Sequence, residues 1–259
     1  MRKINPLHAV HAGWIRFKNK AGLYVAFTVF SFVVSMVITT VASGVGAAFT
    51  FSTFLQSTIV ALLAGAVSGL LNVGFAHFAR LDEQGAEVEF GDFLRGFKVN
   101  VKSLVIVMVA TVLLSQFTSL LMPQELLSFQ LDQEQSQDFE EVMMAFEELA
   151  EVMRANMTSF YLFVIAQLLL SVLFIFAPYY ASLEGMDAVD ALKRSLITAL
   201  PQFFQIFIAL LIVVVLAIPL VVLTLGLGVL VIIPVIQLVT YDMYAQMTDA
   251  TEESRTEES

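Results

Sequence analysis

The run FFQIFIALLIVVVLAIPLVVL, residues 203–223, contains no charged residue, and Gln205 is its one polar side chain. A transmembrane helix needs about 20 apolar residues to cross about 30 Å of hydrocarbon, at about 1.5 Å of rise per residue. The run therefore predicts a membrane-spanning helix. Continuous apolar sequence, without alternation of apolar and polar residues, favours a helix over a strand of a membrane β-barrel.

Further charge-poor runs of similar length occur along the chain, and each predicts a span. With the first run they cover residues 21–43, 55–79, 103–122, 159–181, 203–223 and 229–247. The composition agrees, because 58% of the 259 residues are hydrophobic and 14% are charged, whereas soluble domains carry roughly 25% charged residues. The expected fold class is an all-α polytopic membrane bundle, with six transmembrane helices arranged as three hairpins.

A short amphipathic segment precedes each predicted hairpin. In FGDFLRGFKVN, residues 90–100, helical spacing places Phe90, Phe93, Leu94 and Phe97 on one face, together with Val101, which follows the segment. Similar segments are NPLHAVHAGWIRFKNK, residues 5–20, and DAVDALKRSL, residues 187–196. We expect three interfacial helices whose aromatic side chains enter the acyl boundary and whose cations meet the lipid headgroups.

Orientation follows from the distribution of Lys and Arg among the loops. Of the 13 basic residues, Arg154 alone falls on the side that receives the connections after spans one, three and five. Basic loops stay in the cytoplasm. The sequence therefore predicts a multi-pass protein with both termini cytoplasmic.

The domain organisation predicted is one membrane domain over residues 1–247, with an external acidic insert at 124–158. Residues 248–259 predict a disordered acidic cytoplasmic tail, since they are polar and rich in Glu. Within the insert, an apolar stripe at helical spacing predicts an external helix that packs on the mouth of the bundle or on a partner. Its members are Phe139, Val142, Met143, Phe146, Leu149 and Met153.

Three segments carry a resemblance to known proteins. They are NVGFAHFARLDEQGAEVEFGDFLRGFK (72–98), APYYASLEGMDAVDALKRSL (177–196) and LGLGVLVIIPVIQLVTYDMYAQM (225–247). Together they resemble a broad group of uncharacterised bacterial integral-membrane families, which includes the membrane domain fused to some glycerophosphodiester phosphodiesterases. The resemblance implies a six-helix domain in a bacterial cytoplasmic membrane. It implies no catalytic residues, and the phosphodiesterase activity is not expected here.

Polar and small side chains inside the spans are the candidate site residues. Five amides either bond neighbouring helices together or line a cavity between the hairpins: Asn72, Gln116, Gln167, Gln205 and Gln237. Gly65 and Gly69 form a GxxxG motif, which predicts close helix packing within the chain or against a second protomer.

Metal and cofactor sites are not expected. His8 and His11 are spaced for one helix face and His77 ends a span, but no neighbouring carboxylate or cysteine supports a zinc site, and the chain has no cysteine. No basic patch of the kind that binds nucleic acid is present. The partners expected are the lipid bilayer and either a membrane-protein partner or a second copy of the chain.

Three hypotheses of function stay open at this point. The favoured one is a non-enzymatic scaffold, assembly factor or modulator of a membrane complex. The alternative is a permease for a small molecule or a lipid, with a cavity between the hairpins. A membrane-embedded enzyme is least favoured, because the spans contain no Asp, Glu, Lys or Arg before Asp242.

Overall fold

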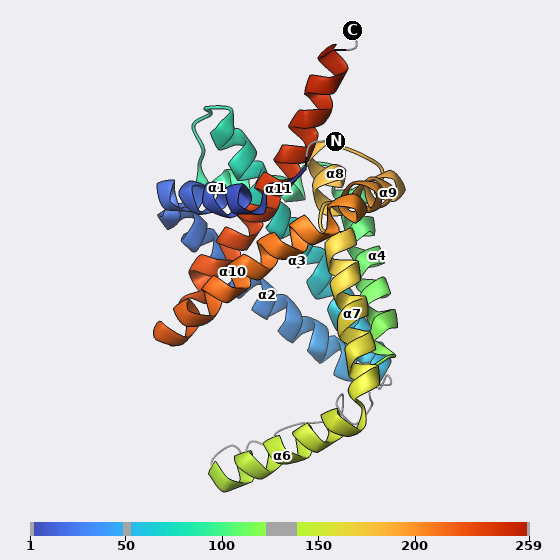
Figure 1. Ribbon diagram of the computed structural model, residues 1–259. Helices are drawn as coiled ribbons and strands as arrows, with labels where there is room; N and C mark the ends of the chain where they lie inside the picture. The colour runs from blue at the N-terminus through green and yellow to red at the C-terminus, as the bar shows by residue number, and fades with distance from the viewer. Residues whose placement is uncertain (1–2, 49–52, 123–138, 258–259) are drawn as a thin grey trace. The chain divides into compact units, whose positions relative to one another are not determined.

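The computed structural model describes residues 3–48, 53–122 and 139–257, and within these ranges the chain is helical, with no strand (Figure 1). The α-helices are α1 (Pro6–Asn19), α2 (Ala21–Ala48), α3 (Thr53–Glu83), α4 (Val101–Ser119), α6 (Phe139–Ala155), α7 (Met157–Leu173), α8 (Ala177–Leu183), α9 (Ala188–Ala199), α10 (Phe203–Leu223) and α11 (Val229–Glu257). Two short 3-10 helices, η1 (Phe90–Phe97) and η3 (Leu200–Gln202), complete the described elements.

Six segments are long and apolar enough to cross a membrane, which confirms the predicted fold class. They cover Ala21–Val45, Leu55–Glu83, Val101–Ser119, Met157–Leu183, Ala188–Leu223 and Val229–Thr248. The fourth contains α7 and α8, which are separate helices because Pro178 stands near the start of α8. The fifth contains α9, η3 and α10. The chain is therefore a polytopic membrane protein.

The chain divides into two compact units. One contains residues 1–112 and 172–259, and the other contains residues 113–171. The first unit holds α1, α2, α3, η1, the larger part of α4 and α8 to α11, and the candidate site lies there. The second holds the end of α4, with α6 and most of α7.

Helix α1 lies against α11 in the first unit (Figure 1). Its buried face is formed by Ala9, Gly13 and Phe17, which are spaced four residues apart. A Cβ added at Gly13 would lie 2.8 Å from Cγ2 and 2.9 Å from the backbone N of Val239, so glycine is what permits this close crossing. The larger residues Leu7 and Trp14 lie on another face and stay exposed.

The segment 90–97 folds differently from expectation, because it is a 3-10 helix and not an α-helix. Three residues per turn place Phe90, Phe93 and Gly96 in one row. Phe93 is fully buried, whereas Phe97 is 40% exposed. A Cβ at Gly96 would overlap the backbone oxygen of Leu70, so η1 packs directly on the backbone of α3. Phe93 therefore inserts into the bundle and not into the acyl boundary.

The acidic C-terminal segment is helical where the composition predicts a disordered tail. Helix α11 continues as far as Glu257. No Gly or Pro follows Pro234 in this helix, and the residues after Thr248 include several strong helix formers, so the backbone hydrogen bonding continues.

Candidate functional site

A polar pocket of about 180 Å³ lies between α2, α3 and α11. Thr28, Ser31 and Ser35 contribute hydroxyl groups from α2, and Ser68 and Asn72 contribute a hydroxyl and an amide from α3. The remaining lining residues are apolar: Phe32, Leu71, Phe75 and Ile233. Hydroxyls and an amide gathered inside apolar spans make this the candidate functional site.

Helix periodicity explains why these side chains meet. Positions 28, 31 and 35 share one face of α2, and positions 68 and 72 share one face of α3. At about 1.5 Å of rise per residue, Ser31 lies about 16 Å along its helix from Lys20, where the first span begins. In a helix that crosses a hydrocarbon core about 30 Å thick without tilt, this position would be near the middle.

The hydrogen bonding within the pocket is incomplete. The Thr28 hydroxyl donates to the backbone oxygen of Tyr24 at 2.8 Å, so its proton is used within its own helix. The Ser31 hydroxyl is buried and has no hydrogen-bond partner among the described residues. A buried hydroxyl without a partner costs about 1–3 kcal/mol. The pocket is therefore suited to a polar group supplied from outside.

The polar face continues along α2 beyond the pocket. Ser35 also lines a neighbouring hollow with Thr39 and Thr40, and Phe32 stands at both. Phe32 is 46% exposed and Thr39 is exposed, so this part of the helix surface is open. Thr28, Ser31, Ser35 and Thr39 together form a row of hydroxyls, which we call the hydroxyl stripe of α2.

An aromatic cluster adjoins the pocket at Phe75. The Phe93 ring of η1 stacks between the rings of Phe78, at 4.1 Å between centroids, and Phe27, at 4.3 Å. Phe75 lines the pocket and meets Phe27 edge to face at 5.0 Å. Tyr24 meets Phe78 and Phe93 edge to face, at 5.2 and 5.7 Å. Phe75 is therefore the ring that the cluster and the pocket share.

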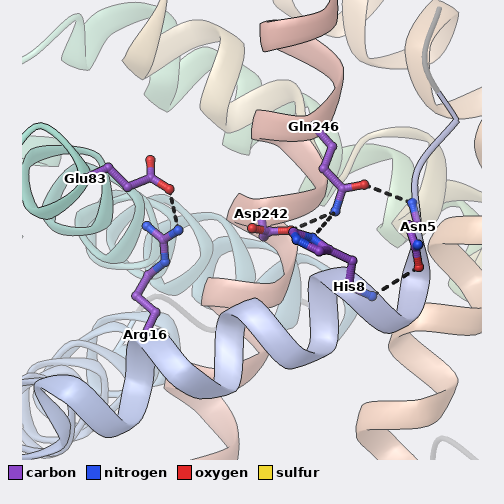
Figure 2. Close-up of polar contacts among 6 residues, drawn as sticks. All are labelled: Asn5, His8, Arg16, Glu83, Asp242 and Gln246. Atoms are coloured by element: carbon purple, nitrogen blue, oxygen red, sulfur yellow. Dashed lines mark hydrogen bonds and ion pairs between the residues drawn. The ribbon is translucent and has the colours of Figure 1, made fainter.

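Ionic contacts fasten α1 to α3 beyond the aromatic cluster (Figure 2). The Arg16 guanidinium bonds to the Glu83 carboxylate and donates to the backbone oxygen of Ala79 at 3.3 Å. Lys20 pairs with Asp82 at 2.7 Å, and Tyr241 of α11 donates to Glu83 at 2.6 Å. Burial alone would lower the pKa of Arg16, but the hydrogen bond and charge of Glu83 outweigh it and raise that pKa.

A second group of contacts joins the start of α1 to α11 (Figure 2). Nδ1 of His8 lies 3.5 Å from the Asp242 carboxylate. The Gln246 amide donates to Asp242 at 2.7 Å and accepts from the backbone N–H of Asn5 at 2.9 Å. The Asn5 side chain caps α1 by accepting from the backbone N–H of His8. The only acid that sequence analysis found in a span is thus a docking contact for α1.

The segment from α8 to α9 is held by polar contacts as well. Nε2 of His77 lies 2.8 Å from the Ser182 hydroxyl, and Arg80 donates to the backbone oxygen of Leu183 at 2.8 Å. Tyr244 donates to Glu184 at 2.6 Å. The Asn100 amide donates to the backbone oxygens of Ala181 and Met186. These bonds connect α3, α11 and the loop before α4 to α8.

The structure distributes the predicted amides among different surroundings. Of the five, Asn72 lines the pocket. Gln237 accepts from the Tyr179 hydroxyl at 3.3 Å, and Gln167 bonds to Ser115 within the second unit. The Gln116 amide oxygen accepts from the Ser119 hydroxyl at 3.5 Å, and Gln205 is half-buried on α10.

The predicted packing glycines face α4. A Cβ at Gly65 would lie 2.6 Å from Cγ2 of Val112, and one at Gly69 would overlap Met108. Small side chains here let α3 and α4 approach closely.

The helix predicted to be external is α6, and the structure describes part of its predicted apolar stripe. Met143 and Phe146 are exposed, whereas Leu149 and Met153 are half-exposed. The side chains of Phe139 and Val142 lie outside the described residues. The insert before Phe139 also lies outside them.

Two of the histidines considered as zinc ligands contact different residues. His8 lies against Asp242, and His77 lies against Ser182. Among the described residues, no group of three or more His, Cys, Asp and Glu side chains could hold a metal ion.

The sequence analysis did not identify the hydroxyl stripe, nor the carboxylates that bind the side chains of α1. The signal for the stripe was present, because hydroxyls recur at positions 28, 31, 35 and 39 of an otherwise apolar span. Nothing local marked Ser68 as its neighbour or Asp242 as the partner of His8, since these pairs are far apart in the chain. No family model, curated protein or solved structure matches this chain.

Proposed function

We propose that this polytopic membrane protein works by binding a partner within the membrane, as a scaffold, assembly factor or modulator of a membrane complex, and not as an enzyme. The observation that carries the proposal is the hydroxyl stripe of α2. The Ser31 hydroxyl has no hydrogen-bond partner in the part of the chain that the structure describes, and the stripe continues onto an exposed helix surface at Thr39.

Lipid tails offer no hydrogen bonds to such a stripe. Hydroxyls and amides on membrane helices bond across helix interfaces, with gains of about 1–2 kcal/mol in model peptides. In α2, 17% of the residues in the most apolar stretch are buried within the chain. The helix therefore has room for a neighbour. A transmembrane helix with small and hydrogen-bonding side chains fits this face best.

Site-directed crosslinking in native membranes tests the proposal. The chain has no cysteine, so single cysteines carrying a photoreactive group introduce no background. We expect labels at Ser35→Cys and Thr39→Cys to give discrete protein adducts. The matched controls are Val33→Cys and Val37→Cys, which are 57% and 56% exposed on the same helix, and we expect them to label lipid.

Removing the hydroxyls provides the second arm of the test. Ser31→Ala combined with Ser35→Ala and Thr39→Val should abolish the adduct formed from a label at Phe32→Cys. Thr40→Val is the control, because the Thr40 hydroxyl bonds to the Met36 backbone oxygen of its own helix at 2.9 Å. Equal labelling at all four positions, or an adduct that survives loss of the hydroxyls, contradicts a partner on this stripe.

The depth of the pocket favours a second candidate, a permease for a small polar molecule. Phe75 lines the pocket, and the Phe93 ring lies 5.7 Å from the Phe75 ring. Solute release from vesicles containing the purified protein tests this alternative. A permease predicts solute release by the native protein, whereas a binding protein predicts no release.

A further inference from the structure

A second hollow of the first unit lies between α1, α10 and α11, away from the hydroxyl stripe. This groove has a volume of about 560 Å³, within the range of about 300–1,000 Å³ typical of ligand sites. Its walls on α10 and α11 consist entirely of Val, Ile, Leu and Ala side chains. An apolar groove along membrane-spanning helices is complementary to an acyl chain.

The wall contributed by α1 has a different character. Leu7 and Val10 are apolar, but His11 and Trp14 follow them along the same face. The next position of that face is Lys18, whose Nζ lies 5.9 Å from the Trp14 ring centroid. The groove thus combines aliphatic walls with the indole of Trp14, and the Lys18 cation lies beside that indole, which matches the apolar chain and the anionic headgroup of a phospholipid.

Lys18 differs from the other cations at this end of α1. Arg16 is paired with Glu83, and Lys20 is paired with Asp82. Lys18 is exposed, and it pairs with no carboxylate of the described residues. Its charge is therefore available to an anion from outside the chain, while its neighbours hold α1 in place.

The packing of α1 fixes this wall in position. Because Ala9, Gly13 and Phe17 are turned into the protein, Leu7, Val10 and Trp14 must face the groove. The close contact between Gly13 and Val239 keeps α1 on α11, so the groove is preformed. A preformed site avoids the cost of ordering α1 when the ligand binds.

We propose that this groove binds one anionic phospholipid, with an acyl chain between α1, α10 and α11 and the phosphate at Lys18 beside Trp14. The predicted orientation places α1 at the cytoplasmic leaflet, where anionic lipids give the surface a negative potential. A juxtamembrane Lys contributes about 1 kcal/mol of attraction to such a surface.

Native mass spectrometry of the whole protein, released from micelles containing phosphatidylglycerol or phosphatidylcholine with identical acyl chains, tests the proposal. We expect a retained lipid with a preference for phosphatidylglycerol. Lys18→Gln should weaken phosphatidylglycerol retention about fivefold, the factor that corresponds to about 1 kcal/mol, and should leave phosphatidylcholine unchanged. The control Lys193→Gln removes an exposed cation from α9 and should have no effect.

A second variant tests the acyl chain. Ala217→Phe places a ring in the groove and should reduce retention of both lipids, with thermal unfolding in detergent verifying that the protein remains folded. Equal retention of the two lipids, an equal loss in Lys18→Gln and Lys193→Gln, or unchanged retention in folded Ala217→Phe would overturn the proposal. An oligomer that Ala217→Phe dissociates without loss of lipid would assign the groove to a second copy of the chain, and would also overturn it.

Discussion

The Phe93 ring stacks on the Phe78 ring with 4.1 Å between their centroids and 9° between their planes. One residue comes from a short connecting segment and the other from the end of a transmembrane helix. This contact places η1 inside the bundle, next to Phe75, which lines the polar pocket. It also supplies the most direct test of the fold.

Phe93→Ala should destabilise the protein strongly. Truncating a buried phenylalanine costs about 3–5 kcal/mol in soluble proteins. Phe97→Ala is the matched control, because Phe97 belongs to the same element and is 40% exposed, whereas Phe93 is fully buried. Reversible unfolding in mixed micelles measures both. Similar losses of unfolding free energy in the two variants would mean that Phe93 is not the residue that anchors η1.

Gly13→Ala should separate α1 from α11. The added Cβ would lie 2.9 Å from the backbone N of Val239, and a backbone atom cannot move away as a side-chain tip can. Overpacking of this kind costs about 1–3 kcal/mol. We expect disulfide formation between Asn5→Cys and Gln246→Cys to slow several-fold.

Gly22→Ala is the control for this change, because a Cβ at Gly22 meets nothing within 4 Å. Disulfide formation at the native rate in Gly13→Ala would show that α1 does not need this close contact with α11.

Arg16 and Glu83 should show coupled contributions to stability. Their ion pair joins α1 to α3, and the Arg16 side chain is 14% exposed while that of Glu83 is 42% exposed (Figure 2). A double-mutant cycle with Arg16→Gln and Glu83→Gln should give a coupling free energy of about 1–2 kcal/mol in denaturant unfolding. Additive effects of the two changes would indicate a solvated surface pair that does not contribute to the free energy of unfolding.

Asp92 should make stability depend on acidic pH. The backbone N–H of Glu89 donates to its carboxylate at 2.9 Å, and this bond, followed by that from Arg95, holds the pKa of Asp92 below its usual value. A carboxyl group whose pKa is lower in the folded state stabilises the fold above its unfolded pKa of about 3.9, and that stability is lost as pH falls through the folded value.

Asp92→Asn should therefore cost about 0.5–1 kcal/mol at pH 7, the range of a helix-capping interaction, and flatten the pH dependence of unfolding below about pH 4. Glu87→Gln, at an exposed loop position, provides the control. A pH profile of Asp92→Asn that superimposes on that of the unchanged protein below pH 4 would contradict this role.

Local sequence was sufficient for the spans because the driving force for each is local. A charge-free run such as 203–223 satisfies its backbone hydrogen bonds within itself, whatever its neighbours are. Helix ends also follow local features, as at Asn5, which caps α1 with Pro6 at the first helical position. The six spans and the all-α class could therefore be derived before any contact was known.

The packing of one helix face on another could not be derived in that way. Helical periodicity identifies the apolar face of a helix, but not the element against which that face packs. The amphipathic pattern of residues 90–97 is the same whether Phe93 contacts lipid or Phe78. The 3-10 geometry of η1, with the small Gly96 against Leu70, directs Phe93 to Phe78. His8 and Asp242 are joined only by the crossing of α1 on α11. The sequence by itself determined which segments enter the membrane, because transfer free energy is a property of each segment. Tertiary structure alone decided that three hydroxyls of α2 and two polar groups of α3 share one pocket, because this depends on how the helices pack against one another.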